Sequence, residues 1–182
     1  MQYFISDCHF GHKGSLLWNN GTVRSGFKNI KELENLMISN WNSVVSSNDE
    51  VYFLGDFAYK CSKNYAETMF WQLNGIKHLI EGNHDYNIAS RFVNCWESIS
   101  QIKQIDFIND NGIKQEIILC HYPLLTWKNK EHGSWHLHGH THGSIQSLNE
   151  YILRHDCSVE VNGYIPKSLV QISNIMLNKL HV

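Results

Sequence analysis

The sequence contains few of the features that mark linkers, membrane spans or nucleic-acid surfaces. Its 182 residues include two prolines, Pro123 and Pro166, and no stretch rich in glycine and serine. Its apolar runs are far shorter than the ~18 residues of a membrane-spanning helix. Fifteen basic residues against seventeen acidic ones give a net charge of −2, which argues against a strongly basic surface for long nucleic acid. We therefore expect one globular domain over 1–182 and no membrane partner.

The few cysteines do not form the pattern of a disulfide-bonded protein. There are five cysteines, an odd number, widely spaced and without a C-x-x-C pair. Secreted disulfide frameworks usually show an even number in a shorter chain. Met1 and Gln2 lead directly into an apolar run, with no basic segment of the kind that opens a secretory leader. We expect reduced, mostly buried thiols in a cytoplasmic protein.

The hydrophobic pattern predicts an α/β fold. Short apolar runs predict strands over Gln2–Ser6, Glu50–Leu54, Lys77–Ile80, Gln115–Leu119 and Trp135–Leu137. Apolar residues at spacings of three and four predict helices over Ile30–Val44, Tyr65–Leu73 and Leu169–Leu180. Alternating strands and helices in the first half favour parallel pairing. A further run over Gln104–Ile108 predicts a hairpin with the fourth strand, so we expect mixed pairing.

Histidine is the residue in excess, with twelve copies, and many follow the predicted strands. Each of the five strands is followed by Asp, Asn or His. The segments are Asp7-Cys8-His9, Gly55-Asp56, Gly82-Asn83-His84-Asp85, His121 and Gly139-His140-Thr141-His142. Ligands bind at the carboxyl edge of such sheets, and i, i+2 pairs in extended chain share a face. We expect these side chains to converge on one site.

Seven of these residues are candidate metal ligands: Asp7, His9, Asp56, Asn83, His121, His140 and His142. Seven ligands exceed one four-coordinate ion but suit two ions bridged by a carboxylate, and Asp56 is the natural bridge. Two divalent ions and two carboxylates leave about two positive charges, which a hydroxide and a phosphoester would neutralise. Such two-metal sites stabilise the attacking and leaving oxygens in displacement at phosphorus. Nitrogen and oxygen donors without thiolate suit Mn, Fe or Zn.

These motifs resemble those of the calcineurin-like metallophosphoesterases, which run D-x-H, G-D, G-N-H-D/E, H and G-H-x-H. All five stand here in that order, and the resemblance extends from residue 3 to about residue 168. It is strongest to the small, single-domain bacterial and phage-type members. It implies a four-layer α/β/β/α sandwich with two mixed sheets and a dinuclear metal site at the carboxyl ends of the strands.

The resemblance also implies roles for individual residues. The first metal would take Asp7, His9, Asp56 and His142, and the second Asp56, Asn83, His121 and His140. His84 would assist the leaving group near the substrate, while a metal-bridging hydroxide attacks phosphorus. Asp85 could orient the His84 ring. Manganese is the expected ion, since the family commonly uses it.

Several points stay open from the sequence. We expect a small phosphodiester or cyclic nucleotide as substrate, with phosphomonoesters, a non-catalytic scaffold and a nuclease as alternatives. His12 could contact phosphate or cap a turn. Arg24 could clamp phosphate, since guanidinium suits bidentate contact, or lie solvated at the surface. Trp127, in the 124–135 segment, is expected to pack on the sheet rather than stack a base. The oligomeric state cannot be read from the sequence.

Overall fold

A computed structural model of the chain describes residues 1–18, 23–86, 95–108, 112, 114–149 and 152–179. It contains two mixed sheets, which confirms the predicted fold class. The first sheet has the order β4-β3-β2-β1-β9, and the second has the order β5-β6-β7-β8. In the first, β1 (Gln2–Ile5), β2 (Glu50–Phe53), β3 (Ile76–Ile80) and β4 (Ser98–Ser100) are parallel, and β9 (Lys167–Ser168) pairs antiparallel with β1. In the second, β6 (Lys114–Cys120), β7 (Trp135–His138) and β8 (Arg154–Asp156) are parallel, and β5 (Ile102–Ile108) pairs antiparallel with β6.

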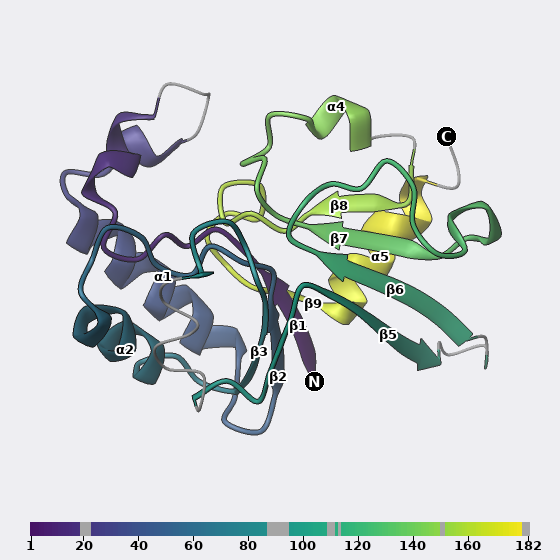
Figure 1. The fold of residues 1–182 in the computed structure, drawn as a ribbon, viewed down its shortest axis with the longest axis horizontal. Coiled ribbons are helices and arrows are strands. Elements are labelled where there is room, and N and C mark those ends of the chain that lie inside the picture. The colour runs from purple at the N-terminus through teal and green to yellow at the C-terminus, as the bar shows by residue number, and fades with distance from the viewer. Residues whose placement is uncertain (19–22, 87–94, 109–111, 113, 150–151, 180–182) are drawn as a thin grey trace.

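Helices α1 (Ile30–Val44) and α2 (Lys63–Trp71) lie beside the first sheet, on the side away from the second (Figure 1). Each begins at a polar cap. The Asn29 side chain accepts a hydrogen bond from the Glu32 amide, and the Ser62 hydroxyl accepts one from the Tyr65 amide. Such caps satisfy amides that have no partner within the helix. The other described helices are α5 (Leu169–Lys179), the one-turn α4 (Gln146–Asn149) and 3-10 turns over Lys13–Leu17, Val23–Gly26 and Lys130–His132.

Alternation along the first sheet builds two separate cores. Tyr3 and Ile5 face α1 and α2, whereas Phe4 between them faces the second sheet. A strand that is buried on both faces has a continuous run of apolar residues in the sequence, so these strands could be predicted. The core between the sheets also receives Ile172 and Met176 from α5. Helix α5 thus helps to hold the two sheets together.

The opposite face of the second sheet is polar but buried. It carries His136 and His138, covered by the 122–134 segment and α4. Trp127 packs against His136 with ring centroids 5.2 Å apart, and its indole N–H donates to the Ser134 carbonyl. The expectation that Trp127 packs on the sheet is confirmed.

Five strands and three helices lie where the sequence predicted them, with ends shifted by one or two residues. The predicted hairpin is β5–β6, although residues 109–111 within its turn lie outside the described residues. Leu180, the predicted end of α5, also lies outside them. Strands β4, β8 and β9 were not predicted. No helix in the described part of the chain has the length and apolar character needed to cross a bilayer.

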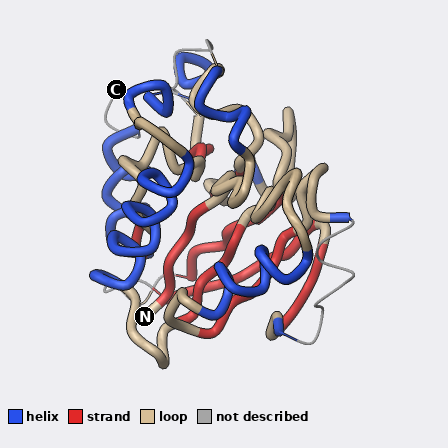
Figure 2. The backbone as a smooth tube through the Cα atoms, turned by 90° about the vertical axis from the view of Figure 1, so that its left-hand side faces the viewer, coloured by secondary structure: helices blue, strands red, loops and turns tan. Residues whose placement is uncertain are grey.

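The parallel strands of both sheets end in the same region. The loops after β1, β2, β3, β6, β7 and β8 gather there, between the two sheets (Figures 1 and 2). A hydrogen bond from the Asp7 amide to the Gly55 carbonyl ties the first two of these loops, and one from the Gly139 amide to the His121 carbonyl ties two others. The topology therefore brings residues from 7 to 160 to one edge.

Candidate metal centre

The seven candidate ligands are carried on loops with unusual backbone conformation. Five of them have positive φ: Asp7, His9, Asp56, His140 and His142, with values from 47° to 71°. Non-glycine residues rarely adopt this left-handed region. The expected mechanism of convergence, in which i and i+2 side chains share a face of an extended chain, is therefore wrong. The loops turn sharply after each strand, and the turns aim the side chains inward.

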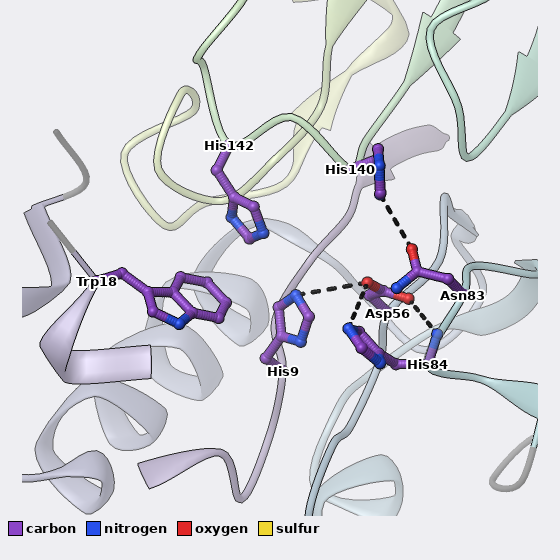
Figure 3. Close-up of a pocket in the computed structure, with 7 residues that line it drawn as sticks. All are labelled: His9, Trp18, Asp56, Asn83, His84, His140 and His142. Atoms are coloured by element: carbon purple, nitrogen blue, oxygen red, sulfur yellow. Dashed lines mark hydrogen bonds and ion pairs between the residues drawn. The ribbon is translucent and has the colours of Figure 1, made fainter. Parts of the chain in front are cut away.

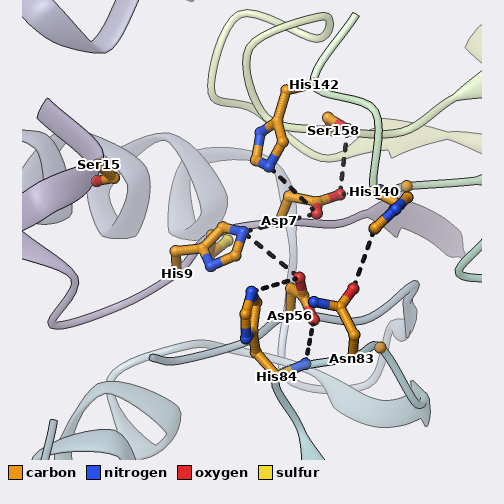
Figure 4. A network of polar contacts seen from close by, with 12 residues as sticks. Asp7, His9, Ser15, Asp56, Asn83, His84, His140, His142 and Ser158 are labelled. Atoms are coloured by element: carbon orange, nitrogen blue, oxygen red, sulfur yellow. Dashed lines mark hydrogen bonds and ion pairs between the residues drawn. The ribbon is translucent and has the colours of Figure 1, made fainter. Parts of the chain in front are cut away.

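Three side chains form the first half of the site (Figure 4). His9 Nε2 and His142 Nε2 each lie 3.7 Å from Asp7 Oδ1. These three residues can offer ligand atoms that lie within 4.8 Å of one another. Two ligands of one ion, each bound at about 2.1 Å, stand roughly 3–3.5 Å apart. The spacing is thus near that required for a shared cation.

The second half of the site is centred on Asp56 and Asn83. His121 Nε2 and His9 Nε2 each lie 3.6 Å from Asp56 Oδ2. The Asn83 amide oxygen lies 3.1 Å from His121 Nε2 and 3.0 Å from His140 Nδ1. Asp56 therefore faces ligand candidates of both halves, as a bridging carboxylate must. The structure brings all seven predicted ligands together.

Unsatisfied polar atoms show that these residues fit a cation. Asp7 Oδ1 and His9 Nε2 are buried and form no hydrogen bond to the described residues. Buried polar atoms without a partner are rare and costly. Both face the same space, between oxygen and nitrogen donors suited to divalent transition metals. Asp7, His9, Asp56 and His142 would hold one ion, and Asp56, Asn83, His121 and His140 the other.

The protonation state of His9 and the hydrogen bond of His121 favour metal binding by these two residues. Burial lowers the pKa of His9 to about 4, so its ring is neutral at pH 7. His121 Nδ1 lies 2.7 Å from the Leu54 carbonyl, which leaves Nε2 free to face Asp56 when Nδ1–H donates. Neutral imidazole is the form that binds metals.

The two carboxylates differ in their titration. Burial opposes ionisation of Asp7, but the adjacent His9 ring and the charges of His142 and His121 outweigh burial and lower its pKa. Burial and the nearby Asp7 raise the pKa of Asp56 to about 7, against the opposing influence of His121. A cation between them would favour the ionised form of both.

Glu160 and Arg24 support the first half of the site from behind. Glu160 Oε1 lies 3.0 Å from His142 Nδ1 and accepts a hydrogen bond from Arg24 Nε. The Glu160 carboxylate therefore orients His142 so that Nε2 faces Asp7. Burial opposes protonation of His142, but this hydrogen bond raises its pKa.

Neither expectation for Arg24 holds. Its side chain is fully buried and donates through its guanidinium to the backbone carbonyls of Asp7 and Cys8. A guanidinium committed to four protein acceptors and closed to solvent can neither clamp a phosphate nor lie on the surface. Arg24 instead fixes the backbone of the first metal-ligand loop.

The predicted orientation of His84 by Asp85 is also wrong. The Asp85 oxygens accept hydrogen bonds from the amides of Asp56, Phe57 and Gly82, at 2.7–2.9 Å. Asp85 thus ties the loop that carries Asp56 to the loop that carries Asn83. Burial raises its pKa, and the three amides oppose that shift.

His84 lies at the open side of the site. Its Nε2 stands 3.9 Å from Asp56 Oδ2, and its ring packs on Tyr59 with centroids 3.8 Å apart. Its side chain is 30% exposed, and burial lowers its pKa. It lines a cavity of about 300 Å³ with Trp18, His140 and other ligand candidates (Figure 3). His84 is therefore placed to reach a ligand in this cavity.

His12 is buried behind this cavity. Its ring packs against Tyr59 and Trp18, with centroids 4.9 Å and 5.4 Å away, and it is not among the described residues that line the cavity. Burial lowers its pKa to about 4. In this position His12 supports the two aromatic rings, so the structure does not favour direct phosphate contact.

Trp18, Tyr59 and Glu160 belong to the site but were not predicted from the sequence. Trp18 and Tyr59 lie outside the ligand motifs, and aromatic residues are common in cores. Glu160 follows β8, whose Arg154-His155-Asp156 sequence has no apolar pattern. A recognised strand ending at Asp156 would have placed Glu160 at the same edge as the other loops.

Comparison with known proteins places the chain in a family. The family model for calcineurin-like phosphoesterases matches residues 3–144, and the chain belongs to this family. Its members hydrolyse phosphoesters with the help of metal ions, and they typically bind two divalent cations, in keeping with the Asp and His cluster described above.

The relatives are small proteins of archaea, phages and bacteria. The chain is 34% identical to an uncharacterized protein, MJ1445, of Methanocaldococcus jannaschii, over 92% of this chain and 86% of that protein. It is 26% identical to the Gene 66 protein of Mycobacterium phage L5, over 89% and 86%. A crystal structure of the protein of unknown function AQ665 from Aquifex aeolicus matches with a TM-score of 0.73 and 26% identity, over 96% of this chain and 98% of that one.

Proposed function

We propose that this protein is a metal-dependent phosphodiesterase that acts on small phosphodiesters or cyclic nucleotides. One observation carries the proposal: Asp56 stands between two groups of histidine, asparagine and carboxylate donors that are spaced for two cations. When bound, such ions supply an activated water and neutralise charge on the phosphoryl group. We propose manganese as the ion: nitrogen and oxygen donors without thiolate suit Mn, Fe or Zn, and the resemblance to the family favours manganese among them.

In this proposal, His84 assists departure of the alcohol. Its partly exposed ring lines the cavity, where a histidine can donate a hydrogen bond or a proton to the leaving oxygen. Asp85 holds the loops in place rather than acting on the ring. A cavity of about 300 Å³ suits a small substrate better than a long polyanion, as does the net charge of −2.

The experiment is a substrate panel with Mn²⁺: p-nitrophenyl phosphate, bis(p-nitrophenyl) phosphate and 2′,3′-cyclic nucleotides. Faster turnover of the diesters supports the proposal. Preference for the monoester would make the protein a phosphatase, and absence of turnover with two bound ions would favour a binding scaffold.

The variant His84→Ala tests the role of that residue. We expect it to retain both metals, measured by elemental analysis, and to lose about 10²–10⁴-fold in kcat. Equal loss of metal would show that His84 is a ligand instead.

A further inference from the structure

A second cavity adjoins the metal centre on the side of Asn83 and His140. We call it the Tyr122 pocket, and its volume is about 390 Å³. Gly82 and Cys120 form part of its wall, and they directly precede Asn83 and His121 in the chain. The Tyr122 ring lies 5.0 Å from the rings of both His121 and His140. The pocket and the metal centre therefore share one wall.

The rim of the Tyr122 pocket is apolar and exposed. Tyr86, Ile102 and Tyr122 line it and are 79%, 59% and 44% exposed, and Leu124 lies beside them. Contiguous exposed apolar side chains mark binding sites in soluble proteins. Two aromatic rings at such a rim suit the flat face of another aromatic group.

The charge of the Tyr122 pocket excludes a second phosphate. Glu81 is the single charged side chain among its described lining residues, and Gln101 adds a neutral amide. A carboxylate repels phosphate, whereas it can accept a hydrogen bond from the amino group of a base. The volume lies within the roughly 300–1,000 Å³ of small-molecule pockets.

We propose that the Tyr122 pocket binds an uncharged aromatic group, such as a nucleobase, of a phosphoester whose phosphoryl group lies at the metal centre. This inference rests on the proposed function and extends it to the substrate. It explains why a phosphodiester would be the substrate. One ester substituent would enter the Tyr122 pocket while the other faces Trp18 across the first cavity. The aromatic group is held by stacking and by Glu81.

The kinetic test compares two diesters with the same leaving group, phenyl p-nitrophenyl phosphate and methyl p-nitrophenyl phosphate, with Mn²⁺. The double variant Tyr86→Ala/Ile102→Ala removes part of the rim without touching a ligand candidate. We expect kcat/KM for the phenyl diester to fall at least about fivefold, the lower end of the loss on removing an aromatic stacking partner. The methyl diester should change less than twofold, because in both substrates the p-nitrophenyl leaving group faces Trp18 and only the phenyl group would enter the Tyr122 pocket.

Ile108→Ala is the matched control, since Ile108 is 73% exposed at the far end of the same strand, β5. It should leave both diesters unchanged. Equal losses for both substrates in the double variant, or no loss, would overturn the assignment of the Tyr122 pocket. Absence of turnover of either diester by the unmodified protein would instead overturn the proposed function.

A binding measurement tests the Tyr122 pocket without catalysis. Adenosine, an uncharged nucleoside, is titrated at millimolar concentration into ¹⁵N-labelled protein in Mg²⁺ buffer. We expect the amide signals of Gly82, Gln101 and Cys120 to shift, and the double variant to lose the shifts. Shifts confined to the Trp18 indole would place the aromatic group in the first cavity and overturn the proposal.

Discussion

Replacing Asp85 with asparagine tests whether this residue holds the metal-ligand loops in place. The Asp85 side chain is 1% exposed, and its oxygens accept three backbone hydrogen bonds. Oδ2 serves the amides of Asp56 and Gly82, and Oδ1 serves that of Phe57. Asparagine has nearly the same shape, but one oxygen becomes an NH₂ group that also donates.

The loss of stability in this variant follows from these hydrogen bonds. In Asp85→Asn the new NH₂ group faces the Phe57 N–H or the other two amides, so at least one hydrogen bond is lost. The hydrogen bonds that remain are weaker, because their acceptor no longer carries a negative charge. Hydrogen bonds to charged groups contribute about 1.5–3 kcal/mol each and neutral ones about 0.5–1.5 kcal/mol. We expect the free energy of unfolding to fall by about 3 kcal/mol, since relief of the buried charge offsets part of the loss.

Two measurements check this prediction. Urea unfolding of the metal-free protein, followed by circular dichroism, gives the stability. Calorimetric titration with Mn²⁺ should show affinity lower by about 10–100-fold, the usual effect of residues that support metal ligands. Asp106→Asn is the control, because the Asp106 side chain is 37% exposed and bonds to Lys114 at the hairpin. Asp85→Asn with unchanged stability and Mn²⁺ affinity would refute the reasoning.

Three further variants probe the supporting structure. Glu160→Gln weakens the hydrogen bond that orients His142 and should lower Mn²⁺ affinity about tenfold by calorimetry; full affinity would show that the carboxylate does not set the ring. Gly139→Ala would place a methyl group against the Asp7 carboxylate, and elemental analysis should show loss of bound metal, whereas normal metal content would contradict this close packing. Burial lowers the pKa of His136 to about 4 from 6.5, so the unfolded chain binds its proton first and stability falls as pH drops from 6.5 towards 4, by about 3 kcal/mol. Urea unfolding in EDTA at pH 7 and pH 4 should show a smaller fall for His136→Gln than for the unmodified protein.

The sequence predicts strands best where both faces of a strand are buried. The apolar runs of β1, β2 and β6 are continuous for that reason. The polar residues that follow these runs in the sequence indicated the loops that carry the candidate ligands. The short strand β8 was not predicted, because its buried residues Arg154 and His155 are polar. Their side chains form hydrogen bonds with the side chains of Asn149 and Asn162. A polar strand of this kind has no pattern that periodicity can detect.

The metal-ligand candidates could be predicted, but their supporting contacts could not. Parallel strands bring their carboxyl ends to one edge, so the residue types after each strand were enough to predict that the seven candidate ligands lie together. Arg24 meets Glu160 across 136 residues of sequence, and Asp85 meets Phe57 across 28. Such pairings depend on how the loops turn, which the residue types alone do not determine.

The left-handed backbone conformation of the candidate ligands lowers the stability of the fold at the positions that the metal centre requires. Each non-glycine residue in that conformation costs about 1–2 kcal/mol, a cost that glycine avoids. Asp56→Gly would relieve this strain and also remove a carboxylate that is buried beside Asp7. Selection of this chain for heat resistance alone would therefore favour glycine at such positions and erase the metal centre, whereas selection for turnover retains a fold less durable than its architecture allows.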